Sequence, residues 1–120
     1  PGSALYDFGD MVRTSTAAAA EDEADLTQVF AKRDYFEALA RGYLEGAKFL
    51  TPSERENLVF AGKLSTFEVG IRFLADFLAG DVYFHTAYPE HNLFRARNQF
   101  KMVASLEEQT ADFEEIVRGL

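Results

Sequence analysis

The sequence contains no cysteine and only three prolines in 120 residues. Without cysteine the chain can form no disulfide, no thiolate metal site and no cysteine nucleophile, which fits a cytoplasmic protein. Positive charge is also scarce, because 20 acidic residues face 12 basic ones, giving a formal net charge of −8 at pH 7. Nucleic acids and anionic membrane surfaces are bound through lysine and arginine, so we expect neither as a partner.

Long hydrophobic runs are missing as well. No apolar stretch approaches the ~20 residues of a membrane-spanning helix, and no basic segment followed by an apolar one opens the chain, so we expect no secretory leader. Hydrophobic residues still make up 48% of the sequence, twelve of them phenylalanine. This composition predicts one domain with its own core. Because Pro1 leads directly into apolar sequence, we interpret the chain as part of a longer protein, with a tag remnant ending Gly2-Ser3 as the alternative.

Apolar residues recur at steps of three and four in four segments, which predicts helices over residues 3–15, 33–50, 51–80 and 91–117. Thr51-Pro52-Ser53-Glu54 has the residues of a capping box, and Gly80 is a natural helix stop. No strand-like alternation persists apart from a short piece at 26–30. The sequence therefore predicts an all-α fold with antiparallel packing of the two long helices.

Several candidate chemical sites are weak. Asp7-Phe8-Gly9 has the letters of the kinase metal-binding triplet but lies in helical sequence, so a structural role is favoured over metal binding. His85 and His91 do not have the spacing of a zinc site, and surface or capping roles are favoured. The acidic run 21–25 lacks the alternating ligands of a calcium loop and is interpreted as a solvated loop.

The third predicted helix offers a stronger candidate. Glu68, Arg72 and Asp76 are spaced four apart and therefore share one helix face. They could form an exposed salt-bridge ladder, or Arg72 could lie in a cleft and bind hydroxyl, carbonyl or phosphate oxygens. The segment Asp81-Val82-Tyr83-Phe84 follows directly, and its aromatic rings could form a platform for a sugar. The residues alone leave both interpretations open.

Five blocks, in order, give the sequence a resemblance to a known family. They are Pro1-Gly2-Ser3-Ala4-Leu5-Tyr6-Asp7-Phe8-Gly9-Asp10, Leu64-Ser65-Thr66-Phe67-Glu68, Gly70-Ile71-Arg72-Phe73-Leu74, Gly80-Asp81-Val82-Tyr83-Phe84, and His91-Asn92-Leu93 with Arg95, Arg97, Gln99 and Phe100. Together they resemble the C-terminal helical part of the aminoglycoside-phosphotransferase-like kinases, and most of all the N-acetylhexosamine 1-kinase group. The resemblance spans nearly the whole chain.

This resemblance implies a C-terminal helical acceptor-binding subdomain over residues 1–120. In that family the nucleotide lobe, the catalytic aspartate and the metal-binding strand lie upstream. The full-length enzyme would use ATP and Mg²⁺ to phosphorylate a hexosamine-type sugar at its anomeric hydroxyl. The chain alone would have no catalytic residue, would bind neither cofactor and would be inactive, with the N-terminal kinase lobe and the sugar acceptor as its partners.

The resemblance also implies roles for individual residues. Arg72 and Tyr83 match positions that contact the acceptor sugar, and Arg13 is a weaker candidate. Asp7 and Asp10 would support the preceding metal-binding strand through hydrogen bonds. Two departures concern the sugar specificity, since the stretch 85–89 is less basic than the family pattern, and Phe94 stands where an acidic residue is usual. A second hypothesis is a free-standing helical module that forms a dimer or binds a protein partner.

Overall fold

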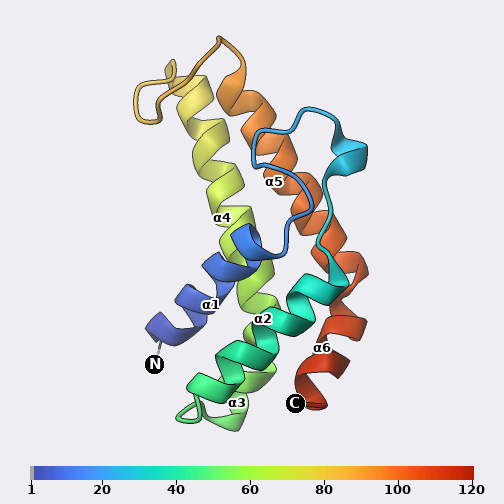
Figure 1. Cartoon of the computed structure of the whole chain (residues 1–120). Helices are drawn as coiled ribbons and strands as arrows, with labels where there is room; N and C mark the ends of the chain where they lie inside the picture. Colours follow the sequence, from blue (N-terminus) through green and yellow to red (C-terminus); the bar gives the residue numbers. More distant parts are fainter. Residues whose placement is uncertain (1) are drawn as a thin grey trace.

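A computed structural model describes residues 2–120, with side chains described from residue 4 onward. This part of the chain is helical and contains no strand (Figure 1). The elements are α1 Gly2–Ser15, the 3-10 turn η1 Leu26–Gln28, α2 Arg33–Gly46, α3 Pro52–Glu56, α4 Leu58–Ala79, α5 His91–Glu108 and α6 Thr110–Arg118. The predicted all-α class is confirmed.

Helices α4 and α5 form the long antiparallel pair that the sequence predicts, joined by the loop 80–90 at one end of the molecule (Figure 1). Helix α1 crosses the first half of α4, and α2, α3 and α6 gather at the end of the molecule away from the loop. The molecule is elongated, with principal extents of 44 × 29 × 19 Å.

Glycines at the helix crossings allow the backbones to approach closely. A Cβ atom on Gly9 of α1 would lie 2.5 Å from the carbonyl oxygen of Ala61, and one on Gly62 would lie 2.7 Å from Cγ1 of Val12. Gly70 has the same role toward α5. Where α1 and α5 cross it, the packed face of α4 therefore carries small residues, and larger side chains at these positions would separate the helices.

The core lies where α1, α2 and α6 meet the lower part of α4. The rings of Phe36 and Phe113 stack with their centroids 4.1 Å apart, and Phe8 meets Phe36 edge-on at 6.3 Å. All three side chains are fully buried. Phe8 and Phe36 thus link α1 to α2, while Phe113 brings in α6, which explains why the second and fourth predicted helices carry phenylalanine on their inner faces.

Three helix boundaries differ from the sequence prediction. Helix α2 ends at Gly46 rather than Leu50, the predicted helix over 51–80 is interrupted at Asn57, and the one over 91–117 is interrupted at Gln109. The side-chain amide of Gln109 donates hydrogen bonds to the carbonyl of Ala31 and to the Oγ atom of Ser105. We attribute this break to contacts with the segment before α2, a tertiary effect that no local pattern encodes.

Two local signals are confirmed. The hydroxyl of Thr51 accepts from the N–H of Glu54, and the Glu54 carboxylate accepts from the N–H of Thr51, which completes the capping box of α3. Gly80 ends α4 in a left-handed conformation with φ 99°. The expected extended piece at 26–30 is instead a 3-10 turn, followed by a single antiparallel bridge between Ala17 and Ala31.

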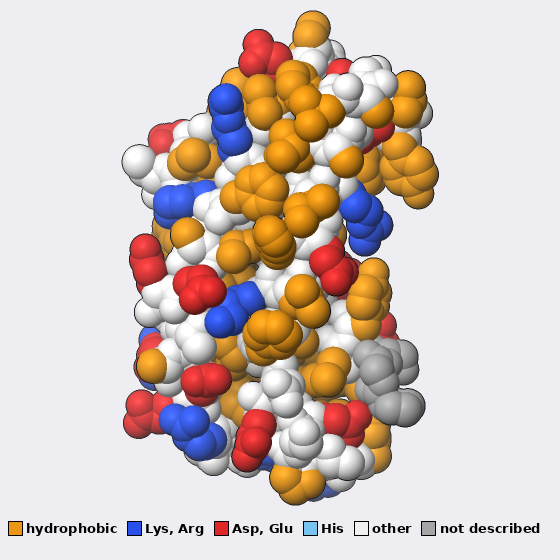
Figure 2. All heavy atoms as spheres, turned by 180° about the vertical axis from the view of Figure 1, so that it is seen from behind, with side chains coloured by type: hydrophobic (Ala, Val, Ile, Leu, Met, Phe, Trp, Pro, Cys, Tyr) orange, Lys and Arg blue, Asp and Glu red, His pale blue; other side chains and the backbone are white. Residues whose placement is uncertain are grey.

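The apolar seam of α4 faces outward. Its members Phe60, Leu64, Phe67, Ile71 and Leu78 are all exposed. Figure 2 shows hydrophobic side chains gathered along this face of the molecule. The buried face of the same helix holds the small and polar residues that let α1 and α5 approach. None of the helices in residues 2–120 is long and apolar enough to cross a membrane.

Candidate functional site

The end of α4 carries a buried carboxylate that organises the following loop. The Asp76 side chain accepts hydrogen bonds from three successive backbone N–H groups, those of Val82 at 3.1 Å, Tyr83 at 2.8 Å and Phe84 at 3.0 Å. A fourth bond comes from the side-chain amide of Asn92 on α5, at 2.8 Å. Asp76 is 6% exposed, so these donors replace the water that its charge would otherwise bind.

The backbone before these donors turns sharply. Gly80 and Asp81 both have positive φ angles, 99° and 61°. The N–H of Asp81 donates to the carbonyl of Asp76 at 2.8 Å, and the Asp81 side chain accepts from Asn92 at 3.0 Å. This reversal aims the next three N–H groups at the Asp76 carboxylate, and the hydrogen bonds offset the strain of a non-glycine residue at positive φ.

Arg95 completes the cluster from α5. One of its terminal nitrogens, Nη1, donates to the carbonyl of His85 at 2.9 Å and to the side-chain oxygen of Asn92 at 3.0 Å. The guanidinium also lies over the ring of Phe73, 5.5 Å from its centroid. Its Nε atom is buried and has no hydrogen-bond partner among the described residues. Two blocks that carry the family resemblance, 80–84 and 91–95, therefore meet around Asp76.

Burial by itself raises the pKa of Asp76, but the hydrogen bonds from Phe84, Tyr83, Asn92 and Val82 outweigh it and hold the pKa below the ordinary value of 3.8. The carboxylate is thus ionised at neutral pH with its acceptor positions occupied. A general base needs a free lone pair, so this arrangement does not suit Asp76 for proton transfer. The role of Asp76 is to fix the conformation of the loop after α4.

The two predicted acceptor-contacting residues lie at this end of α4. Arg72 is exposed, one turn before Asp76, and forms no hydrogen bond or ion pair with any described residue. Tyr83 is 79% exposed, and its ring meets that of Phe84 edge-on at 4.9 Å. The ladder Glu68–Arg72–Asp76, one of the two interpretations left open by the sequence, is not formed among the described residues, because Asp76 points into the loop instead. Arg72 is therefore available to a ligand.

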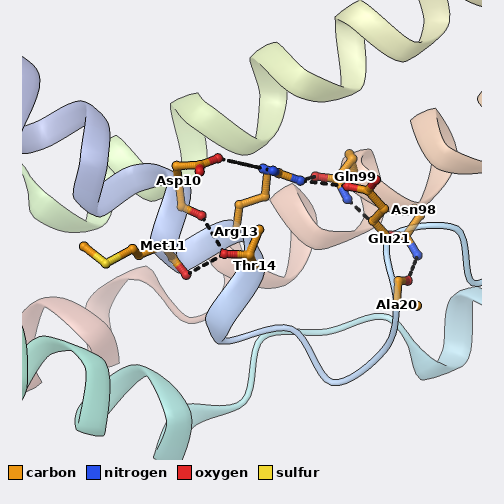
Figure 3. Close-up of polar contacts among 8 residues, drawn as sticks. All are labelled: Asp10, Met11, Arg13, Thr14, Ala20, Glu21, Asn98 and Gln99. Carbon is orange, nitrogen blue, oxygen red and sulfur yellow. Dashed lines mark hydrogen bonds and ion pairs between the residues drawn. The ribbon is translucent and has the colours of Figure 1, made fainter. Parts of the chain in front are cut away.

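Arg13 has a different environment (Figure 3). Its guanidinium pairs with Asp10 at 3.2 Å and with Glu21 at 3.0 Å, and it lies 3.5 Å from the side-chain oxygen of Gln99. No polar contact joins Arg13 to Tyr83 within residues 2–120. The structure thus places Arg13 in an ion-pair cluster between α1 and α5, where a sugar would have to compete with two carboxylates.

Asp7, Phe8 and Gly9 are interior residues of α1. Phe8 belongs to the core and Gly9 faces α4, so both are explained by packing. Asp7 is exposed and accepts no hydrogen bond from a described residue, while Asp10 binds Arg13. Residues 2–120 contain no strand that Asp7 and Asp10 could support, so that role stays a prediction.

The acidic loop is held against α5. The buried amide of Asn98 donates to the carbonyls of Ala20 and Glu23, at 2.9 and 3.2 Å. His91, expected at the surface or as a cap, is instead only 6% exposed. Its Nδ1 atom accepts from the N–H of Ala87, and its Nε2 atom lies 2.9 Å from the Asp22 carboxylate. Asn98 and His91 of α5 therefore hold the exposed acidic run in place.

The described residues offer no ready set of ligands for the Mg²⁺ that the resemblance implies. No three His, Asp or Glu side chains in this part of the chain are grouped so that they could hold a metal ion. The acidic side chains of the Asp76 cluster are already hydrogen-bonded to loop amides and Asn92. A Mg²⁺ ion would therefore need ligands from outside the described residues.

The sequence is matched by no family model. Among the residues of this site, the role of Asp76 is absent from the sequence interpretation, which considers Asp76 only as a member of a possible salt-bridge ladder. A signal was present, because Asp76 falls on the same helix face as Phe73 and Gly62, the packed side of α4. An isolated acidic residue on a buried helix face, four positions before a glycine stop, indicates a loop anchor.

Proposed function

We propose that this chain is the acceptor-side helical part of an ATP-dependent kinase that phosphorylates a hexosamine-type sugar at the anomeric hydroxyl. The basis is the resemblance of the five sequence blocks to the N-acetylhexosamine 1-kinase group. The nucleotide lobe, the catalytic aspartate and the metal ligands would be supplied by the other part of the enzyme. Phosphoryl transfer depends on those groups, so the chain alone is expected to be inactive.

One observation supports an acceptor-binding role most directly. Asp76 holds the N–H of Tyr83 at 2.8 Å, and Arg72 lies one turn away on the same helix. The backbone of Tyr83 is thus held one helical turn beyond Arg72, and both the phenol ring and the unpaired guanidinium are exposed. An aromatic ring and a fork of N–H donors are the groups that proteins use to bind a sugar face and its hydroxyls.

The test uses a longer form of the protein that carries the upstream lobe. Purified enzyme is incubated with ATP, Mg²⁺ and a panel of hexoses and N-acetylhexosamines, and sugar 1-phosphate is measured. We expect Arg72→Ala and Tyr83→Ala to lower kcat/KM by about tenfold or more while the melting temperature is unchanged, because both side chains are exposed.

Arg41→Ala is the matched control. Arg41 is an exposed arginine on α2 whose contact is a surface pair with Glu37, so its removal should leave turnover unchanged. If the longer protein phosphorylates no sugar in the panel, the proposed activity is wrong. If it does so and Arg72→Ala has no effect, the activity stands and the assigned acceptor site is wrong.

A second candidate function is a helical protein-interaction module without catalysis. The observation that favours it is the exposed apolar face of α4, which includes Phe60, Phe67 and Leu78 at 55%, 41% and 76% exposure. Contiguous apolar surface of this kind is typical of interaction sites. Light scattering and dye binding on the chain itself distinguish this function from the kinase proposal, which needs the additional lobe.

A further inference from the structure

The outward face of α4 has the size of a protein interface. We call the residues Phe60, Leu64, Phe67, Ile71 and Leu78 the α4 stripe, and they are 41–76% exposed. Val82 and Tyr83, each 79% exposed, follow it in the chain just beyond Gly80. With ~200 Å² for a fully exposed large side chain, the seven residues offer roughly 840 Å². A stable interface covers about 800 Å² on each partner.

The apolar residues of the stripe are spaced symmetrically about its midpoint. With the half-buried Leu74 included, the apolar positions are Phe60, Leu64, Phe67, Ile71, Leu74 and Leu78, at steps of four, three, four, three and four. A two-fold axis at the level of Val69 would therefore place Phe60 of one copy opposite Leu78 of an antiparallel second copy. A surface that matches itself under such an axis is what a closed dimer requires.

The two ends of the face have complementary shapes. Beside Phe60 lies an apolar pocket of about 330 Å³ between α1 and α4, to which Leu5 and Tyr6 also contribute. At the other end Val82 and Tyr83 protrude, and their backbone is fixed by Asp76. Antiparallel pairing would bring each protruding end over the pocket of the other copy. A side chain held rigidly before binding loses little entropy on docking.

The charges on this helix distinguish between the two orientations. Glu68 and Arg72 lie one turn apart on the same flank of the stripe, and neither has an ion-pair partner among residues 2–120. In an antiparallel pair, Glu68 of each copy is near Arg72 of the other. In a parallel pair, the two-fold axis runs along the helices and puts this flank of the two copies on opposite sides of the interface, so Glu68 and Arg72 would gain no opposite charge there. Helix α4 carries two acidic and two basic residues, so the net charge of −8 does not reside on this face.

We propose that the α4 stripe binds a second copy of this chain in antiparallel orientation, with Val82 and Tyr83 of each copy seated in the pocket beside Phe60 of the other. This deepens the second candidate function and needs neither ATP nor sugar, so its failure leaves the kinase proposal intact. Because the dimer covers Arg72 and Tyr83, it competes with an acceptor sugar for the same surface.

The first experiment is sedimentation equilibrium of the 120-residue chain across the micromolar range. We expect a mass of twice 13.5 kDa for the unmodified protein and loss of the dimer for Phe67→Glu. Phe49→Glu is the control, because Phe49 is 72% exposed but lies outside α4, and it should remain dimeric. A monomeric unmodified chain, or a Phe67→Glu variant that still dimerises, overturns the proposal. Circular dichroism checks that both variants keep their helices.

The second experiment tests the orientation by disulfide cross-linking. Because the sequence has no cysteine, an introduced cysteine can pair only with another introduced cysteine. In an antiparallel dimer the two copies of position 60 are roughly 27 Å apart, since 18 residues at ~1.5 Å separate them from position 78. Phe60→Cys and Leu78→Cys should therefore form a disulfide with each other when mixed and none when alone. Efficient disulfide formation by Phe60→Cys alone would show a parallel arrangement and contradict the proposal.

The third experiment exchanges the charges. Glu68→Arg should weaken dimerisation roughly tenfold, because each Arg72 then meets a like charge. The double variant with Arg72→Glu should restore it, since the opposite charges face one another again. Failure of the double variant to recover any affinity would contradict the antiparallel pairing.

Discussion

The Oδ1 atom of Asp76 accepts a hydrogen bond from the backbone N–H of Tyr83 at 2.8 Å, across the turn that ends α4. The same carboxylate also binds Val82, Phe84 and Asn92. One side chain thus fixes three successive loop residues and links them to α5. The exposed position of the Tyr83 ring follows from this backbone arrangement, and both functional proposals depend on it.

Replacing Asp76 by Asn should release the loop. An amide has one acceptor oxygen and turns an NH₂ group toward backbone donors, so some of the N–H groups of residues 82–84 would lose their partners. We expect faster hydrogen exchange at those amides and a lower melting temperature. Glu68→Gln is the control, being the corresponding change at an exposed, unpaired residue of the same helix. Unchanged protection of 82–84 in Asp76→Asn would refute the anchoring role.

The depressed pKa of Asp76 predicts a specific acid sensitivity. Its hydrogen bonds favour the ionised form in the folded state, so its contribution to stability is complete above the ordinary value of 3.8 and is lost as the pH falls through the lower folded pKa. Urea midpoints measured at decreasing pH should therefore fall more steeply for the unmodified chain than for Asp76→Asn. Asp22 and Glu54, whose pKa values are also lowered, are present in both proteins and cancel in the comparison. If the urea midpoints of the two proteins fell by the same amount as the pH decreased, this assignment would be contradicted.

Asn98 should anchor the acidic loop. Its buried amide donates to the carbonyls of Ala20 and Glu23, and Asn98→Ala would leave these carbonyls without that donor. We expect a loss of about 1–3 kcal/mol in the free energy of unfolding and faster proteolysis within 20–25. The neighbouring exposed Arg97→Ala serves as the control, with a change within about 0.5 kcal/mol. Equal proteolysis of the two variants would exclude the anchor.

The sequence was most informative where the signal is local. The capping box at Thr51 and the stop at Gly80 were predicted and are present, because each needs only a few adjacent residues. The breaks at Asn57 and Gln109 were missed. Gln109 binds the carbonyl of Ala31, a residue 78 positions away, and only the folded chain brings the two together.

The packed face of α4 shows a second limit. The large apolar residues at steps of three and four marked the helix correctly, but Phe60 and Phe67 point outward. The buried face is marked by Gly62, Thr66 and Gly70, small residues at steps of four that permit close helix packing. Predicting a core from the largest side chains alone therefore selects the wrong face. The possible ladder through Asp76 likewise rested on four-residue spacing alone, which does not tell which face of the helix is buried.

Helix packing at Gly9 can be tested with a matched pair of substitutions. In Gly9→Ala the new Cβ would lie 2.5 Å from the carbonyl oxygen of Ala61, so α1 must move away from α4. We expect a loss of about 1–3 kcal/mol in unfolding free energy. Gly42→Ala makes the same change in α2, where no atom lies within 4 Å of the added methyl group.

Because alanine is the better helix former, Gly42→Ala should gain about 0.5–1 kcal/mol. Urea unfolding of the two variants and the parent under one set of conditions measures both effects. The opposite signs matter, since a general intolerance of helical glycine substitution would destabilise both proteins. If Gly9→Ala were as stable as the parent, the α1–α4 crossing would have room for a methyl group despite the 2.5 Å distance to the Ala61 carbonyl oxygen. Gly9 would then not be required for the crossing.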